Sequence, residues 1–440
     1  MINFKNRIIW IVLAFLVIVY VGLFTFQSIN KPSEEIQIFY ADRITTAHKI
    51  LIDNYNKINQ GKIKVVPIDF PNFDFSTNER KEVLARSLRG TGDGIDLFAV
   101  DLIWVQRFAK WAEKLDLYFP AEEKKRLLPS SLETCYYDGE LVAVPLNMGP
   151  SLMYYREDIL SRLKGGDELI KKVNNGITWE EFIQIGQKFG IDKPYYLFHG
   201  ADYEGLICVY MQLLYSLKPN YFQEYDFNMQ TPEAKKALQL LVDLISKYKV
   251  SPAVVTNFTE VPSYEYFIKN DGLFIQGWPT YGQDFKESRF NYEKESHLRT
   301  APLPYFKGGK PSSIFGGWNL MVSKFTDKKK EVLDFVKYLL SDSSQEIFYK
   351  EGGYYPVTRK FYEGEKYLKE YSEIPQIKKM ITMGMHRPAH EDYTKFSKIM
   401  SMYFEQALNR RISVDEALEK ITEAIRIERK IITDYWPLTN

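Results

Sequence analysis

Residues 36–68 read IQIFYADRITTAHKILIDNYNKINQGKIKVVPI and contain a strand, a helix and a second strand in that order. The two ends, Ile36–Tyr40 and Lys62–Ile68, are short apolar runs typical of strands. Between them, helical spacing places on one face Ile44, Ala47, Ile50, Leu51 and Tyr55. Helical spacing returns at Glu79–Leu88 and is followed by a third strand, Ile95–Val100. Strands that alternate with helices predict a mainly parallel sheet with covering helices.

The middle of the chain, from about residue 150 to 300, has a more helical pattern. Ser or Thr before an acidic residue or a proline is typical of helix N-termini. Such signals occur at Thr178 with Glu181, Thr231 with Pro232, Thr326, and Ser413 with Glu416. The chain shows no internal repeat.

The composition is that of a globular chain long enough for two domains. Of 440 residues, 45% are apolar and 26% are charged, which excludes a disordered or collagen-like protein. Lys and Arg number 58 against 57 Asp and Glu, and a net charge of +1 gives no sign of nucleic-acid binding. The two cysteines, Cys135 and Cys208, cannot build a disulfide framework or a four-thiolate zinc site. They could form one bridge, but two unpaired buried thiols are the favoured interpretation.

The N-terminus carries a segment long enough to cross a membrane. Ile8–Phe26 reads IIWIVLAFLVIVYVGLFTF without a charge, and as a helix it would span about 28 Å. Lys5 and Arg7 precede it, which predicts a cytoplasmic N-terminus and a body on the extracytoplasmic side of the cell membrane. The alternative is a cleaved signal peptide, although the apolar run is long for one and no Ala-x-Ala site follows. We favour an uncleaved single-pass transmembrane helix, with residues 1–32 as cytoplasmic stub, anchor and linker.

Familiar catalytic and metal-binding motifs are not found in the sequence. The glycines of RGTGDG, residues 89–94, follow a helix and precede a strand, which is the reverse of a dinucleotide-binding turn. His386 and His390 have the spacing of zinc ligands on a helix, but Pro388 between them interrupts any such helix.

Three segments carry side chains suited to sugars. Gly316–Asn319 reads GGWN, in which the glycines allow a close backbone approach and the tryptophan offers a flat apolar face. Trp278–Tyr281 follows an apolar strand, and Arg387 precedes a helix. Sugar C–H faces stack on aromatic rings, while sugar hydroxyls donate to carboxylates and accept from arginine. In an exported body this combination predicts sugar binding.

These segments resemble the extracellular solute-binding proteins that deliver sugars to ABC transporters, and the trehalose/maltose-binding branch in particular. The similar stretches are Gly90–Val105, Val144–Leu160, His199–Gln212, Gly316–Lys324 with the helix that follows it, and the closing segment from Arg387. The resemblance implies an α/β, two-lobed periplasmic-binding-protein fold of type II, maltose-binding-like, whose lobes close on the ligand about a hinge. It implies a first lobe of residues 33–143 and 303–341 and a second lobe of residues 144–302 and 342–440.

The resemblance also implies a ligand site with no catalytic residue, cofactor or metal. Asp101, Glu204 and Arg387 would bind sugar hydroxyls, and Gly317 would offer its backbone amide. The aromatic walls would be formed by Trp104, Tyr155, Trp278, Tyr281 and Trp318. Asp42 and Arg43 stand at a contact position of the family but match it poorly.

The function implied by the resemblance is the extracytoplasmic binding component of an ABC importer that captures a di- or oligosaccharide. The expected partners are the sugar, the transmembrane permease subunits and the membrane, without nucleic acid, and the body is expected to be a monomer. Two alternatives stay open. A membrane-tethered glycoside hydrolase would use cleft carboxylates, with Asp96 and Asp101 as a candidate pair. A receptor ectodomain would bind the same solute and signal to a partner protein.

Overall fold

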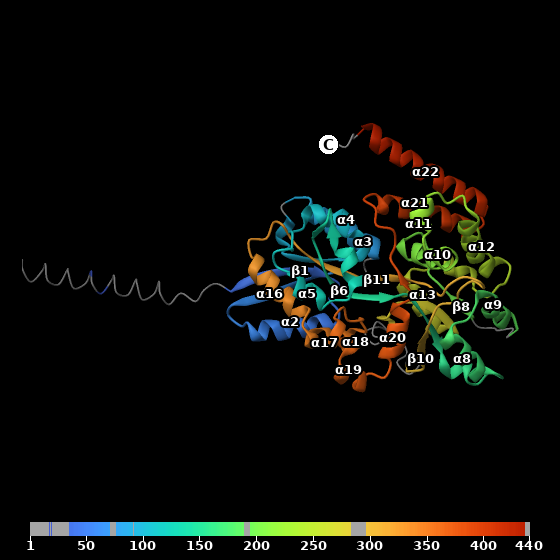
Figure 1. The fold of residues 1–440 in the computed structure, drawn as a ribbon, viewed down its shortest axis with the longest axis horizontal. Helices are drawn as coiled ribbons and strands as arrows, with labels where there is room; N and C mark the ends of the chain where they lie inside the picture. The colour runs from blue at the N-terminus through green and yellow to red at the C-terminus, as the bar shows by residue number, and fades with distance from the viewer. Residues whose placement is uncertain are drawn as a thin grey trace, which may run out of the picture.

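The computed structural model describes residues 35–70, 76–90, 92–188, 194–282 and 296–435, together with Val17 and Val19. The remainder of the predicted anchor, Ile8–Phe26, lies outside the described residues. Within these ranges no helix is long and apolar enough to cross a membrane. Two lobes lie side by side, each built on its own β-sheet (Figure 1).

The sheet of lobe 1 grows from the predicted strand–helix–strand unit. Its strands are β1 (Ile36–Asp42), β2 (Ile63–Asp69), β3 (Leu97–Asp101), β6 (Val144–Pro150), β11 (Ser313–Val322) and β12 (Gly384–Met385). Strand β1 pairs in parallel with β2 and β3, which confirms the expected alternation. Strand β11 runs antiparallel to β3 and β6, and gives the order β12-β11-β3-β1-β2 with β6 on β11.

Helices pack against this sheet through the apolar faces that the sequence indicates. They are α2 (Thr46–Ile58), α3 (Thr77–Leu88), α16 (Lys329–Leu339) and α17 (Asp342–Gly352). The buried face of α2 includes Ala47, Leu51 and Tyr55. Helix α16 begins at Lys329, three residues after Thr326, whose hydroxyl donates to Asp96 (2.6 Å) and accepts from the Lys328 amide (3.1 Å).

Lobe 2 combines a small sheet with most of the helices. The sheet order is β10-β7-β9-β8, formed by β7 (Leu152–Arg156), β8 (Tyr196–Leu197), β9 (Phe274–Gly277) and β10 (Leu298–Ala301). The main helices are α8 (Gly166–Asn175), α9 (Trp179–Lys188), α10 (Glu204–Leu217), α12 (Pro232–Ser246), α13 (Glu260–Lys269), α21 (Tyr393–Leu408) and α22 (Val414–Tyr435). The predicted caps are present, since Thr178, Thr231 and Ser413 each accept a backbone N–H through the side chain.

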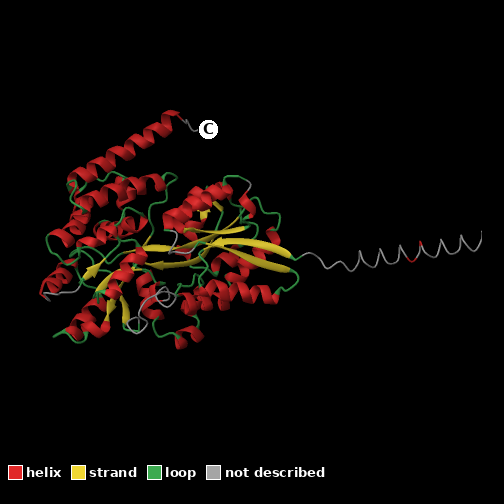
Figure 2. Ribbon diagram, turned by 180° about the vertical axis from the view of Figure 1, so that it is seen from behind, coloured by secondary structure: helices red, strands yellow, loops and turns green. Residues whose placement is uncertain are grey.

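Short elements complete the chain. They are η1 (Gly92–Gly94), η2 (Leu102–Trp104), α4 (Val105–Phe108), η3 (Ala109–Trp111), α5 (Ala121–Lys125), α6 (Pro129–Leu132), η4 (Glu133–Cys135), β4 (Tyr136–Tyr137), β5 (Glu140–Leu141), α7 (Glu157–Leu160), α11 (Tyr221–Tyr225), η5 (Ala253–Asn257), α18 (Arg359–Glu363), α19 (Glu365–Glu370) and α20 (Ile374–Ile381). Figure 2 shows from behind how the long strands of lobe 1 run toward lobe 2.

The lobe boundaries expected at residues 144, 302 and 341 each lie beside a segment that contacts one of the two lobes. Strand β6 pairs with β11 of the first sheet from Val144 to Pro150. Residues 303–312 follow β10 and contact lobe 2, where the Gln212 side chain donates to the Pro304 carbonyl (3.0 Å). Helix α17 packs against α2 of lobe 1. The boundaries themselves stay a prediction.

Candidate functional site

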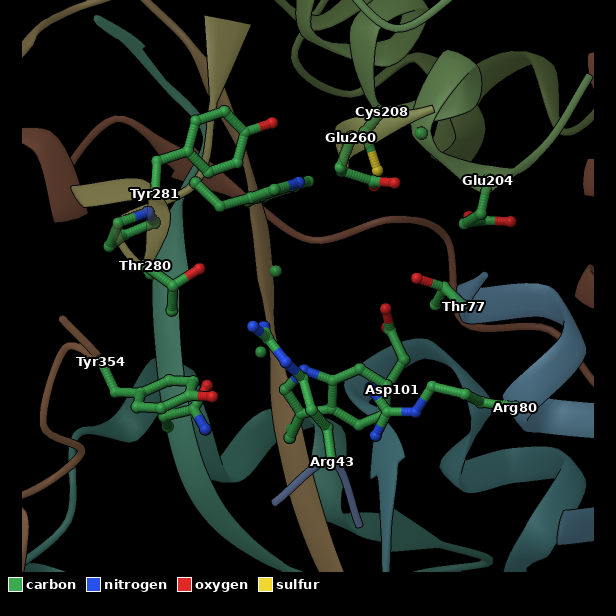
Figure 3. A pocket seen from close by; sticks show the side chains of 18 of the residues that line it. Arg43, Thr77, Arg80, Asp101, Glu204, Cys208, Glu260, Thr280, Tyr281 and Tyr354 are labelled. Atoms are coloured by element: carbon green, nitrogen blue, oxygen red, sulfur yellow. The ribbon is translucent and has the colours of Figure 1, made fainter. Parts of the chain in front are cut away.

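A cleft between the two lobes collects polar and aromatic side chains from both of them (Figure 3). Counting its open mouth, it encloses about 1240 Å³. It is lined by nine of the predicted site residues, namely Asp42, Arg43, Asp101, Glu204, Trp278, Tyr281, Gly317, Trp318 and Arg387. Asp42 and Asp101 end the parallel strands β1 and β3, where open α/β sheets commonly bind ligands.

Asp42 is a positioning residue on the floor of the cleft. Its carboxylate accepts from the Tyr40 hydroxyl (2.6 Å) and the Arg80 guanidinium (3.0 Å), and His48 lies at 3.3 Å. Burial alone would raise the pKa of Asp42, but the hydrogen bond from His48 and the charges of His48 and Arg80 lower it. Asp42 therefore stays ionised and holds Arg80 in place.

Arg80 in turn supports the main tryptophan of the cleft. Its guanidinium carbon lies 4.0 Å from the centre of the Trp318 ring, a cation–π contact. Trp318 remains partly exposed and lines the cleft. The network from Asp42 through Arg80 thus fixes the plane of an aromatic surface.

The glycines next to Trp318 allow a second tryptophan to approach. A Cβ atom on Gly316 would lie 2.6 Å from the Trp278 ring, and one on Gly149 would lie 2.6 Å from Pro279. Gly316 and Gly149 are paired on β11 and β6. The loop after β9 can therefore rest directly on the backbone of these strands, as the pattern GGWN suggested.

Arg387 joins two carboxylates across the cleft. Its guanidinium donates to Asp101 (2.6 Å) and to Glu204 (2.9 Å), and the same oxygen of Glu204 accepts from the Tyr393 hydroxyl (2.5 Å). Burial would lower the pKa of Arg387, but the nearby carboxylates raise it, so the side chain stays charged. Asp101 belongs to lobe 1 and Glu204 begins α10 of lobe 2.

Glu260, at the start of α13, faces the cleft from lobe 2 (Figure 3) and was not among the predicted residues. Burial raises its pKa to about 7, and its backbone amide and the polar groups of Tyr203 and Trp278 offset this only in part. A carboxyl group that changes charge near neutral pH therefore stands beside Trp278.

Tyr281 supports the wall of the cleft from behind. It is 1% exposed, stacks on Tyr154 with ring centres 5.4 Å apart, and its hydroxyl lies 2.7 Å from Nε2 of His199. Burial lowers the pKa of His199 to about 3, so this imidazole is neutral at physiological pH.

Three of the predicted residues do not line the cleft. Trp104 is buried beneath Lys81, whose ammonium lies 5.0 Å from its ring, outside the cleft. Tyr155 is buried in the sheet of lobe 2 and accepts from Asn174 (3.1 Å). Asp96, proposed to pair with Asp101 in a hydrolase, is buried beside Thr326 and Lys328 and does not line the cleft.

Further residues at the cleft carry no local sequence signal. They include Thr77, Arg80, Asn147, Glu260, Tyr354 and Tyr355. Pro279 and Tyr355 also border a second hollow, whose described lining includes Tyr349 and Tyr371. In the described ranges no three His, Cys, Asp or Glu side chains are grouped to hold a metal. Cys135 and Cys208 are both buried and unpaired, as expected.

Comparisons with known proteins agree with this geometry. The family model of the bacterial extracellular solute-binding proteins matches residues 40–346. A probable ABC transporter-binding protein of Deinococcus radiodurans is 26% identical over 331 residues, which are 74% of this chain and 77% of that protein. An arabinooligosaccharide-binding protein of Halalkalibacterium halodurans is 22% identical over 50% of this chain and 48% of its own.

The fold also matches solved structures along most of its length. Maltose-bound MalE3 of T. maritima superposes with a TM-score of 0.79 at 25% identity, covering 89% of this chain and 99% of that one. A solute-binding protein of Thermotoga lettingae bound to α-D-tagatose gives 0.75 at 21% identity, again covering 89% and 99%, and supports the fold alone. The two-lobed, maltose-binding-like fold class is confirmed.

Proposed function

The chain belongs to the bacterial extracellular solute-binding proteins, and on this basis we propose that it captures a sugar between its lobes for an ABC importer. The observation that carries the proposal is the cleft itself. Trp318 is held by Arg80 next to the Asp101–Arg387–Glu204 group, so a flat apolar face and fixed hydrogen-bonding groups meet at one place. Sugars present both kinds of surface at once.

The geometry of the cleft supports a proposed role for each of these residues. Trp318 and Trp278 stack on sugar rings, Gly317 offers its backbone amide, and the carboxylates of Asp101 and Glu260 accept from hydroxyls. Arg387 donates to the ligand from its place between Asp101 and Glu204. Asp42 acts through Arg80, and Arg43 and Thr280 face the same space. Tyr281 is a support for this wall.

A di- or oligosaccharide is the proposed ligand class. The cleft is lined by two tryptophans, Trp278 and Trp318, so it offers more than one aromatic face for sugar rings. It adjoins the tyrosine-lined hollow at Pro279 and Tyr355, which offers space beyond one sugar ring. Relatives named for arabinooligosaccharide and maltose support the same class.

The membrane context is part of the proposal. An extracytoplasmic body agrees with the family, and the uncleaved anchor at Ile8–Phe26 would tether that body beside the permease subunits to which it delivers the sugar. The matched family and the neighbours are binding proteins, and a role without catalysis is the corresponding proposal.

A thermal-shift titration of residues 33–440 against monosaccharides, oligosaccharides and uncharged osmolytes tests the function. We expect a rise in melting temperature with one class of oligosaccharide, because a ligand at a hundredfold excess over Kd stabilises by about 2.7 kcal/mol. The same samples, analysed for cleavage products, should contain none. Turnover of the sugar would favour the hydrolase alternative, and melting curves unchanged by every sugar would reject sugar binding.

A further inference from the structure

An exposed turn lies where the N-terminal segment joins lobe 1. We call residues 57–64, which connect α2 to β2, the basal turn. It lies directly beside the start of β1, since the Ile36 amide donates to the Lys62 carbonyl (2.9 Å) and the Gly61 amide donates to the Glu35 carboxylate (3.1 Å). This end of β1 lies on the side of lobe 1 away from lobe 2 (Figure 1).

The basal turn and its neighbour expose large apolar side chains. Ile58 is 73% exposed and Ile36 is 36% exposed, whereas Leu51 and Tyr55 of the same helix are buried. Exposed apolar surface gains free energy when it leaves water. Two isoleucines at the root of an apolar 19-residue segment point to a membrane as the surface that covers them.

The basal turn also carries three lysines. Lys57, Lys62 and Lys64 are all exposed, and none of them forms an ion pair with another residue of the described chain. The acidic groups close by are Glu35, whose carboxylate accepts from the turn, and Asp53, one helical turn back on α2. Three lysines against these two carboxylates leave the described residues of this face net positive, which complements anionic lipid headgroups.

The basal turn has a fixed shape. The Lys62 and Ile63 amides both donate to the Asn59 carbonyl (2.9 and 3.1 Å), and the Asn59 side chain donates to the Tyr55 carbonyl (2.9 Å). A preorganised turn loses little conformational entropy when it meets a surface. Residues 27–35 can separate it from the end of the predicted anchor by about 30 Å at most.

We propose that the basal turn rests on the anionic phospholipid surface around the anchor, with Ile36 and Ile58 at the headgroup level and the three lysines against lipid phosphates. The inference rests on the proposed anchor at Ile8–Phe26. Strand β1 has seven residues and a length of about 23 Å, so the contact leaves Asp42 and the cleft clear of lipid.

Lipid-borne nitroxide quenching tests the contact in the full chain. The variant Gln60→Cys receives a fluorophore, which the buried Cys135 and Cys208 do not compete for, and the protein is placed in nanodiscs of phosphatidylcholine and phosphatidylglycerol. We expect nitroxide headgroups to remove most of the fluorescence at position 60. A label at Glu419→Cys on α22 of lobe 2 should keep its fluorescence.

Charge reversal supplies the matched comparison. The triple variant Lys57→Glu, Lys62→Glu and Lys64→Glu should lose the quenching, as should high salt, because both remove the attraction to phosphatidylglycerol. The control variant reverses the charge of three exposed lysines of lobe 2, Lys171, Lys188 and Lys269. Its fluorophore at position 60 should be quenched as strongly as in the chain without charge reversal. An unchanged melting temperature shows that each variant is folded.

The outcomes separate the two proposals. A chain that stays with the nanodisc but shows no quenching at position 60 overturns the lipid contact alone. A chain that does not associate with nanodiscs overturns the anchor and the contact together. If the labelled Gln60→Cys variant shows no quenching and its unlabelled form links two chains by a disulfide at position 60, the surface belongs to a second copy and the lipid assignment is overturned.

Discussion

The Arg387 guanidinium lies 2.6 Å from the Asp101 carboxylate, although 286 positions separate the two residues. Asp101 ends β3 in lobe 1, while the other terminal nitrogen of Arg387 holds Glu204 of lobe 2 at 2.9 Å. Both carboxylates are buried, and one cation compensates them. The two lobes are thus linked at the place where the proposed sugar binds.

Replacing Arg387 with methionine should lower the free energy of unfolding and abolish sugar binding. The change leaves two buried carboxylates without their cation, which typically costs about 3–5 kcal/mol. The control is Lys398→Met, which breaks an exposed ion pair with Asp202 and should cost at most about 1 kcal/mol. Urea unfolding measures the free energy of unfolding of both variants. An equal loss of stability in Arg387→Met and Lys398→Met would contradict a special role for Arg387.

Gly316→Ala should weaken sugar binding by displacing Trp278. The added methyl group would lie 2.6 Å from the indole, which cannot stay in place unless the strand moves. Gly90→Ala is the control, because its methyl group meets nothing within 4 Å. Calorimetric titration measures the sugar affinity of both variants. Equal affinities would show that the position of Trp278 does not affect sugar binding.

Sugar affinity should rise as the pH increases through about 7, because an ionised Glu260 is the stronger hydrogen-bond acceptor. Glu260→Gln should remove this dependence. Sugar affinities of both proteins, measured from pH 6 to pH 8, test this prediction. If the affinity of the variant changes with pH as that of the unaltered protein does, another group causes the pH dependence.

The same carboxyl group predicts an opposite trend in stability. Its pKa in the folded chain, about 7, exceeds the ordinary value of 4.5, so the folded state binds the proton more tightly. The contribution of Glu260 is complete below pH 4.5 and is lost as the pH rises through about 7. In urea unfolding without sugar, the free energy of unfolding of Glu260→Gln should not fall as the pH rises through about 7. If it falls as much as that of the unaltered protein, Glu260 is not the group that causes the fall.

Local patterns in the sequence predict the elements of this fold well. The alternation at residues 36–100 depends on neighbours within one turn or one strand, and so do the caps at Thr178, Thr231 and Ser413. The aromatic segments at Trp278 and Trp318 were identifiable for the same reason, since glycine and tryptophan stand side by side at Gly316–Trp318, although these residues lie within β11 and not before a strand.

The other features of the candidate site depend on partners that are distant in the chain. Arg80 resembles any charged helix residue until Asp42, 38 positions away, and Trp318 surround it. Glu260 resembles an ordinary acidic residue in a first helical turn, and only the folded cleft raises its pKa. Trp104 and Tyr155 are aromatic residues in the right segments, but packing turns them into the lobe interiors.

The most direct test of sugar binding between the lobes is a calorimetric titration of Trp318→Ala beside the unaltered protein, with the sugar found by thermal shift. We expect one sugar per unaltered chain and a loss of affinity of about 30-fold in the variant, since a central aromatic contact contributes about 2 kcal/mol or more. Phe325→Ala, which changes a 41% exposed ring outside the cleft, should bind like the unaltered chain. Equal affinities of the Trp318 variant and the unaltered protein would contradict the proposed site.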